Sequence, residues 1–210
     1  MKLLKYLLLP ALLFPPALPA SAQSSGKLFF REDWKEAEAA LPVTQEHVAN
    51  PDLILNLYGP ARDSIKKSNH PQIPNDPYYI WSGECKGNWA VGLRHRNQLV
   101  DLRGDARIRI RSKQSGFRQL RLILKLQSGT WLVSEQSAPY TENWTEKEFR
   151  IARIHWRTLD IETITEGAWV EAPDLSKVEE IGFTDLMEGG GTPASSRLDW
   201  IAVYGKAVSR

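Results

Sequence analysis

The sequence predicts an all-β fold, a β-sandwich. Near the end of the chain, Ser176–Thr184 and Ser196–Gly205 nearly alternate apolar and polar residues, which is the period of a strand with one buried face. Between residues 53 and 170, further short alternating runs are separated by turn residues, and helix signals are few. Many short strands with little helix are typical of a sandwich.

The first residues have the layout of a secretory signal peptide. Lys2 and Lys5 supply a positive start, Leu7–Leu18 is apolar, and Ala20–Ala22 is a small-residue cleavage site. The apolar run contains prolines and is too short to cross a bilayer. We therefore expect residues 1–22 to be removed and the protein to be secreted or periplasmic, with no membrane span.

The composition bounds the rest of the chain. Residues 53–210 are predicted to form one β-sandwich domain, an ordinary size for a single core. The formal net charge of +2 includes Lys2 and Lys5, so the exported chain is near neutral, which argues against a general nucleic-acid binder. Cys85 is the single cysteine and cannot form an internal disulfide. The domain must therefore be held by its core or by a metal ion.

The first part of the chain is predicted to be an arm, a strand and a loop. Residues 23–52 form the N-terminal arm, in which Arg31–Ala40 reads either as a short helix closed by Pro42 or as an irregular segment. Leu53–Tyr58 alternates and predicts a strand. Residues 59–77 are polar and rich in proline, which predicts a long surface loop, and loops of this length are usually functional or disordered.

The middle of the chain is predicted to consist of short strands. Tyr78–Arg94 reads as a hairpin that turns at Glu84–Gly87, and Ala106–Ser112 reads as a strand. Further strands are expected at Leu120–Gln127, Trp131–Ser134, Trp144–Ile151, Leu159–Ile164 and Trp169–Val170. Strand parity predicts a core that contains Ile108, Ile110, Leu122, Leu124, Ile181, Phe183 and Trp200.

Three stretches carry a resemblance to a known group of domains. They are VDLRGDARIRIRSKQSGFRQLRLILKLQSGTWLV from Val100, PDLSKVEEIGF from Pro173 and SRLDWIAVYG from Ser196. Together they resemble the galactose-binding-like β-sandwiches, in particular the family 11 carbohydrate-binding modules and the complex I intermediate-associated domains. The resemblance implies a jelly-roll sandwich over Val100–Gly205. This fold carries binders, enzymes and assembly factors, so the function needs a separate argument.

Aromatic and polar residues gather after the long loop and form the candidate carbohydrate-binding site. Aromatic rings stack on the C–H faces of sugars, while amide, guanidinium and imidazole groups hold the hydroxyls. Neighbouring strand residues point to opposite faces, so only part of the aromatic set is expected to be exposed and the rest to fill the core. The candidates are Tyr79, Trp81, Asn88, Trp89, Arg94 and His95.

A second candidate surface is cationic. Arg107, Arg109 and Arg111 share one face of a strand, and a neighbouring strand could add Arg121 and Lys125. Guanidinium groups bind carboxylates and sulfates through two parallel hydrogen bonds, so such a face suits an acidic polysaccharide. The alternative, which the near-neutral chain favours, is a solvated face where each arginine pairs with Glu or Asp of the next strand.

Enzymatic activity is left open by the sequence. A glycoside hydrolase needs two carboxylates at a fixed separation. The carboxylate candidates are Glu84, Glu135, Asp160, Glu162, Asp185, Glu188 and Asp199. A polysaccharide lyase could use His70, His95 and Tyr79 as base and acid. Arg94 would then neutralise the uronate.

The sequence therefore favours an exported, non-catalytic protein that binds a polysaccharide. One alternative is a secreted glycoside hydrolase or polysaccharide lyase on the same sandwich. Another is an envelope protein that binds a protein partner through the long loop.

The resemblance also implies one structural calcium ion. Domains of this kind use acidic groups near the first strand and an Asp of the last strand, and the matching positions here are Glu32, Asp33 and Asp199. Calcium takes about six to eight oxygen ligands, so backbone carbonyls would have to complete the shell. The alternative is that Asp199 caps a turn or pairs with Arg197.

Overall fold

The computed structural model describes residues 26–84, 86–187 and 193–210. The signal-peptide prediction for residues 1–22, Cys85 and the glycine run at 189–191 lie outside the described residues. The described part contains β-strands and three short 3₁₀ turns, at Gln45–His47 (η1), Arg62–Ser64 (η2) and Ile151–Arg153 (η3). Within these residues, no helix is long and apolar enough to cross a membrane.

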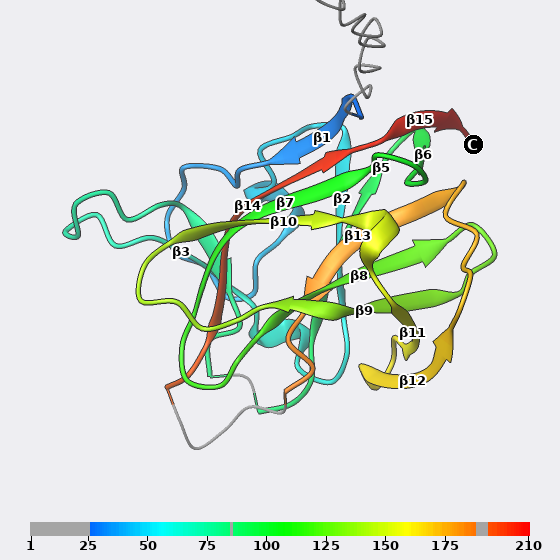
Figure 1. The fold of residues 1–210 in the computed structure, drawn as a ribbon. Helices are drawn as coiled ribbons and strands as arrows, with labels where there is room; N and C mark the ends of the chain where they lie inside the picture. Colours follow the sequence, from blue (N-terminus) through cyan, green and yellow to red (C-terminus); the bar gives the residue numbers. More distant parts are fainter. Residues whose placement is uncertain (1–25, 85, 188–192) are drawn as a thin grey trace, which may run out of the picture.

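The strands form two antiparallel sheets that pack face to face (Figure 1). The six-stranded sheet contains β1 (Leu28–Glu32), β3 (Lys66–Ser68), β4 (Tyr79–Trp81), β7 (Arg107–Gln114), β10 (Thr145–Arg150) and β14 (Ser196–Tyr204). Its order is β10–β7–β14–β4–β3, and β1 also pairs with β14. The all-β sandwich predicted from the alternating runs is confirmed.

The second sheet has nine strands. They are β2 (Leu53–Tyr58), β5 (Ala90–His95), β6 (Gln98–Asp101), β8 (Leu120–Leu126), β9 (Trp131–Ala138), β11 (Trp156–Asp160), β12 (Thr165–Val170), β13 (Val178–Thr184) and β15 (Lys206–Ser209). The order is β12–β11–β9–β8–β13–β5–β2, while β6 joins β13 to β15. Strands β13 and β14 follow each other in the chain but belong to different sheets, so the chain crosses between the layers there.

The main core lies between the two sheets. The parity prediction is confirmed for the six residues Ile108, Ile110, Leu122, Leu124, Ile181 and Phe183, all of which are buried in it. Trp200 is also buried, but it faces away from this core. The register of β14 against β7 shifts between Leu198 and Trp200, and such a bulge turns the following side chains to the opposite face. Trp200 therefore packs under Arg31 on the outer face, at 4.2 Å from the guanidinium carbon to the ring centroid.

The N-terminal arm contains no helix at Arg31–Ala40. Strand β1 occupies the start of that segment, and an irregular stretch follows it. Trp34 has a positive φ of 56°, which a helix does not accommodate, and its side chain is buried in the core. Burial of this ring, together with pairing of β1 to β14, decides the local conformation against the helix pattern.

The predicted hairpin at Tyr78–Arg94 is wrong. Strand β4 pairs with β3 and β14 in the six-stranded sheet, whereas β5 pairs with β2 and β13 in the nine-stranded sheet. The chain between them crosses from one layer to the other. The preceding loop is also shorter than expected, because Lys66–Ser68 forms β3. Similarly, Leu159–Ile164 covers the end of β11 and the turn to β12 rather than a separate strand.

Candidate functional site

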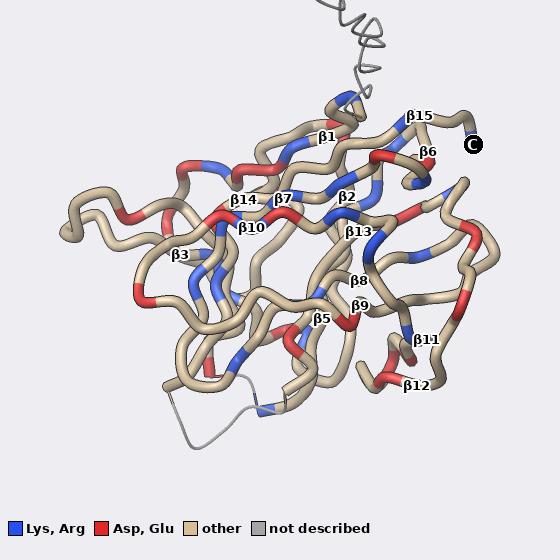
Figure 2. The backbone as a smooth tube through the Cα atoms, in the orientation of Figure 1, with Lys and Arg blue, Asp and Glu red and all other residues tan. Residues whose placement is uncertain are grey.

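The outer face of the six-stranded sheet carries arginines at alternate positions of β7. Each forms an ion pair with an acidic residue of a neighbouring strand: Arg107 with Glu148 at 3.5 Å, Arg109 with Glu146 at 2.5 Å and Arg111 with Asp199 at 2.5 Å. Figure 2 shows the two signs of charge side by side along β7 and β10. The solvated face with paired charges, predicted as the alternative to a purely cationic face, is therefore confirmed.

Aromatic rings lie beneath these arginines. The guanidinium carbons of Arg107, Arg109 and Arg111 lie 4.0, 5.8 and 5.7 Å from the centroids of Tyr204, Trp200 and Trp144. A cation within about 6 Å of a ring centroid is attracted by the face of the ring. Tyr204 and Trp144 are half-buried, so part of each ring reaches solvent. We call these three arginines and three aromatic residues the arginine–aromatic face.

Arg121 and Lys125 do not extend this face. Both belong to β8, which lies in the nine-stranded sheet, so the predicted surface of five cations is wrong. Arg121 pairs with Glu166 at 2.9 Å, and Lys125 pairs with Glu179 at 3.1 Å. The sequence could not show that β7 and β8, although consecutive, lie in different layers.

The outer face of the nine-stranded sheet is covered by the protein's own apolar side chains. A second apolar cluster lies there, made of Ala90, Ile123, Trp131, Val133, Leu159 and Ile164. Tyr58 of β2 contacts Trp131 of β9 edge to face, with 5.0 Å between ring centroids, although three strands separate β2 from β9. The two rings thus close over the sheet. We call this surface the filled face.

One carboxylate is enclosed in the filled face. Glu180 is 1% exposed, and its side chain lies over Gly92, where a Cβ atom would come within 1.8 Å of Glu180 Oε1. Asn56 Nδ2 donates to the carboxylate at 3.1 Å, and the Tyr58 hydroxyl donates at 2.9 Å. Burial raises the pKa of Glu180, and burial together with this negative charge raises the pKa of Tyr58.

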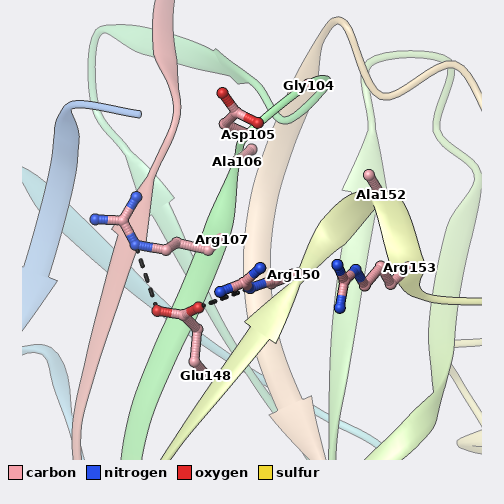
Figure 3. A pocket seen from close by; sticks show the side chains of 8 residues that line it. All are labelled: Gly104, Asp105, Ala106, Arg107, Glu148, Arg150, Ala152 and Arg153. Atoms are coloured by element: carbon pink, nitrogen blue, oxygen red, sulfur yellow. Dashed lines mark hydrogen bonds and ion pairs between the residues drawn. The ribbon is translucent and has the colours of Figure 1, made fainter. Parts of the chain in front are cut away.

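A pocket of about 410 Å³ opens at one end of the arginine–aromatic face (Figure 3). It is lined by Gly104, Asp105, Ala106, Arg107, Glu148, Arg150, Ala152 and Arg153, and we call it the arginine pocket. Its walls come from the turn before β7, the ends of β7 and β10, and η3. The backbone N–H of Ile151 donates to the carbonyl of Ala106 at 3.1 Å, which ties two walls together.

Glu148 forms ion pairs with two arginines of the arginine pocket. Its carboxylate lies 3.5 Å from Arg107 Nε and 3.1 Å from Arg150 Nε, as the dashed lines of Figure 3 show. In the part of the chain that the structure describes, Arg153 forms no ion pair. The pocket therefore offers guanidinium N–H donors together with carboxylate acceptors, which is a suitable lining for a polar ligand.

A second pocket of about 410 Å³ adjoins the first. It shares Asp105 and Ala106 with the arginine pocket and adds the cations Lys27, Arg103 and Lys206. Arg103 pairs with Asp101 at 2.7 Å, and its hydrogen bond lowers the pKa of that carboxyl. The turn at residues 104–106 thus stands between two hollows at the same end of the sandwich.

The six candidate carbohydrate-binding residues do not meet on one surface. Tyr79 and Trp81 belong to the six-stranded sheet, where Tyr79 is 2% exposed and Trp81 is half-buried between Lys66 and Arg197. Trp89 is 1% exposed and packs edge to face on Phe183 in the core.

The polar members of that set lie on the other sheet or beside it. Asn88 uses its amide to hold the backbone carbonyl of Ile164 at 3.1 Å. Arg94 is half-buried on β5, and its neighbour His95 lies against the ring of Phe29 with 5.2 Å between centroids. The change of layer between β4 and β5 is what separates these residues.

Two of the residues predicted for a lyase do lie together. The hydroxyl of Tyr79 is 3.1 Å from His70 Nδ1, and Asp76 Oδ2 is 3.0 Å from the same nitrogen. Burial raises the pKa of Tyr79 to about 12. His95 and Arg94, the other residues of that prediction, lie on β5 in the opposite sheet.

The three carboxylates expected to hold calcium do not fit a cation as they lie. Glu32 accepts the backbone N–H groups of Trp34, Ala49 and Asn50 at 2.7, 2.8 and 3.0 Å. Asp33 pairs with Arg31 and Asp199 with Arg111, not with Arg197. Positive and N–H donor groups therefore stand where oxygen ligands would be needed. Across the described ranges, no cluster of three or more His, Cys, Asp or Glu side chains is suited to a metal.

A comparison with solved structures finds carbohydrate-binding modules. The family 11 module of a cellulosomal cellulase of Clostridium thermocellum is 12% identical, with a TM-score of 0.46 over 82% of this chain and 97% of the module. A family 29 module from Piromyces equi is 12% identical, with a TM-score of 0.44 over 84% of this chain and 91% of that one. An exo-β-agarase is 8% identical, with a TM-score of 0.45 over 83% of this chain and 25% of the enzyme.

Sequence-level comparisons add nothing to these structures. No protein-family model matches the chain, and no curated protein does. The family 11 modules that the sequence resembles are thus among the solved structures to which the chain is similar. The similarity concerns the two-layer β-sandwich, and the ligand must be argued from this chain's own residues.

Proposed function

We propose that this protein binds a polysaccharide at the arginine pocket and along the arginine–aromatic face. The observation that carries the proposal is the pocket, a hollow of about 410 Å³ that opens at the end of a row of stacked arginines and rings. Binding sites for small ligands and cofactors typically have volumes of about 300–1,000 Å³. The hollow therefore has room for a sugar unit, and the face lets a chain of units continue.

The chemistry of the pocket matches the two surfaces of a sugar. Hydroxyl groups donate and accept hydrogen bonds, and the pocket supplies guanidinium donors beside the carboxylates of Asp105 and Glu148. Tyr204 lies under Arg107 at the same end and presents part of its ring to solvent. A half-exposed ring next to polar groups is the arrangement that a sugar C–H face needs. Trp81, on the same sheet, is proposed as a more distant contact.

Affinity electrophoresis in gels that contain soluble polysaccharides tests this proposal. We expect at least one polysaccharide to retard the protein, and we expect Tyr204→Ala to weaken the retardation. Tyr140→Ala is the matched control, because this tyrosine is 54% exposed and lies outside both pockets. Equal migration in every polysaccharide gel and in a plain gel would contradict the proposal, provided that the protein is folded.

We also propose that residues 1–22 direct export, so that the protein meets polysaccharide outside the cytoplasm. The layout of Lys2, the apolar run and Ala20–Ala22 supports this. The mass of the protein recovered from the periplasm or medium should correspond to a chain that starts at Gln23. A cytoplasmic protein of full length would overturn it.

A glycoside hydrolase is the second candidate, because Asp105 and Glu148 line the same pocket. Glycosidases work with two carboxylates on either side of the bond that breaks. New reducing ends on a polysaccharide that the protein binds, absent with Asp105→Asn, would favour this enzyme. Binding without new reducing ends would favour the non-catalytic function.

A further inference from the structure

We infer that the arginine pocket takes an anionic substituent of the polysaccharide, a uronate carboxylate or a sulfate ester. The ligand class is then an acidic polysaccharide. That the anion is carried by a polysaccharide rests on the proposed function. The anion-binding site itself is argued from the pocket alone.

The lining of the arginine pocket carries more positive than negative charge. Arg107, Arg150 and Arg153 face two acids, Asp105 and Glu148. Glu148 is divided between Arg107 and Arg150, and among the described residues Arg153 has no acidic partner. In Figure 3 the three guanidinium groups lie in a row, with Asp105 apart from them. An oxyanion beside Arg150 and Arg153 would supply the missing negative charge.

The alternation of opposite charges across β7 and β10 breaks at the pocket. Arg111 stands directly opposite Glu146 and Arg109 opposite Glu148, so those cross-strand pairs are complementary. At the next position on the same face, Arg107 stands opposite Arg150. Like charges directly opposite each other destabilise a sheet. The exception to the pattern lies at the pocket, where Glu148 is the one carboxylate paired with both arginines among the described residues and a bound anion would relieve the repulsion further.

Further positive charges surround the arginine pocket. The adjoining pocket adds Lys27, Arg103 and Lys206, of which Arg103 is paired with Asp101. These cations extend the positive end of the sandwich beyond the arginine pocket. Charges arranged in this way attract an acidic chain before contact, and the attraction falls with added salt.

The mode of binding follows from the exposure of the groups. The side chain of Arg150 is 63% exposed, so a single ion pair there is weak in water. Strong binding of an anion in this pocket therefore requires two or more guanidinium groups that hold one oxyanion through parallel hydrogen bonds. A repeating acidic polymer that offers an anion at every unit is therefore favoured over one free small anion.

The test uses two assays on the full-length mature protein and the double variant Arg150→Gln/Arg153→Gln. Both side chains are exposed, so the variant is expected to fold. Arg62→Gln is the matched control, because Arg62 is 61% exposed and lies outside both pockets. Polygalacturonate is compared with its methyl ester, and dextran sulfate with dextran. Each acidic polymer, one with carboxylates and one with sulfates, thus has an uncharged counterpart, which is its neutral partner.

In affinity electrophoresis we expect an acidic polymer to retard the wild type and its neutral partner not to. The double variant should lose about tenfold in affinity, the effect of about 1.4 kcal/mol, and raised salt should weaken the wild type. Which acidic polymer retards the protein identifies the carboxylate or the sulfate. Equal retardation by acidic and neutral polymers, unchanged in the double variant, would overturn the inference and leave the proposed function standing.

The second assay separates the anion site from its carrier. Sodium sulfate and sodium glucuronate are titrated at constant ionic strength while the unfolding midpoint is followed. A rise in the midpoint that the double variant loses and Arg62→Gln keeps would support the anion site even if no polysaccharide binds, and the proposed function would then fail alone. No rise, together with no preference for acidic polymers, would overturn the inference. Retention of DNA equal to that of the acidic polymers would overturn the polysaccharide as carrier.

Discussion

The two outer faces of the sandwich differ in the side chains that cover them. On the six-stranded sheet, the arginines of β7 pair with acids of β10 and β14 and stack on rings, and the face stays open to solvent. On the nine-stranded sheet, apolar side chains and the buried Glu180 fill the face. The arginine–aromatic face, which we also call the open face, is available to a ligand. The filled face is occupied by the protein's own side chains.

An outer sheet face of a sandwich is therefore not a binding surface by position alone. On the nine-stranded sheet, Tyr58 and Trp131 contact each other, and Glu180 beside Tyr58 is buried. Burial of the apolar side chains of the filled face stabilises the fold. On the other face, an exposed ion pair such as Arg109 with Glu146 contributes little to folding, because exposed pairs are weak in water, and such a pair is free to serve recognition.

Removal of a ring from the filled face should destabilise the protein more than any other substitution considered below. Trp131→Ala should lower the free energy of unfolding by about 3–5 kcal/mol, because it leaves a cavity beside Tyr58 and Ile123. Tyr204→Ala on the open face should cost about 1 kcal/mol or less, since that ring is half-buried. Urea unfolding followed by tryptophan fluorescence measures both. Equal losses would end the distinction between the two faces.

A smaller effect concerns the pH dependence that Glu180 adds. Burial raises the pKa of this carboxyl in the folded state, so the folded protein binds the proton more tightly than the unfolded chain does. Its contribution to stability is therefore greatest below about pH 4.5 and falls as the pH rises through the raised pKa. Glu180→Gln keeps an oxygen acceptor for Tyr58 and removes this dependence.

The measurement is the difference in unfolding free energy between wild type and Glu180→Gln from pH 4 to pH 8. Relative to the wild type, the variant should gain stability as the pH rises. Glu148→Gln is the control on the open face, where the carboxylate is exposed and paired with arginine. A constant difference for Glu180→Gln over this range would show that the acid is not desolvated as the geometry requires.

The smallest effect is expected for an ion pair of the open face. Arg109→Gln breaks the 2.5 Å pair with Glu146 and should change the unfolding free energy by less than about 1 kcal/mol. Because the side chains are exposed, 1 M salt should abolish most of the difference between variant and wild type. A loss above 2 kcal/mol that salt does not alter would place this face among the structural elements of the fold.

Much of the strand content could be predicted from the sequence, because burial on one side imposes a period of two. Ile108, Ile110 and Phe183 follow that period and are in the core. Trp200 does not, since the bulge in β14 reverses the parity after Leu198. A bulge leaves no mark in an alternating pattern of apolar residues, so the face of Trp200 could not be read from it.

The site was harder to predict than the fold. The arginine stripe of β7 was visible, but the pocket depends on Arg150 and Arg153 meeting the turn at residues 104–106 through tertiary structure. One signal was present in the sequence. In TEKEFR, acids alternate up to Glu148 and the next position on that face is Arg150, so the acidic alternation ends in a cation. With the register of β10 known, that reversal would have indicated the pocket.

Strand β14 ends at Tyr204 in one sheet and β15 begins at Lys206 in the other, with only Gly205 between them. A Cβ atom on this glycine would come within 2.7 Å of Val100 Cγ2 and 2.8 Å of the Asp101 carbonyl oxygen. The two layers are therefore joined here through a single residue that lies tightly against β6. Sliding of one layer past the other at this point would strain the pairing of β14 with β7 and of β15 with β6. We expect a pull along a bound polymer to be resisted at this end of the molecule, beside the two hollows, rather than by slippage of the sheets.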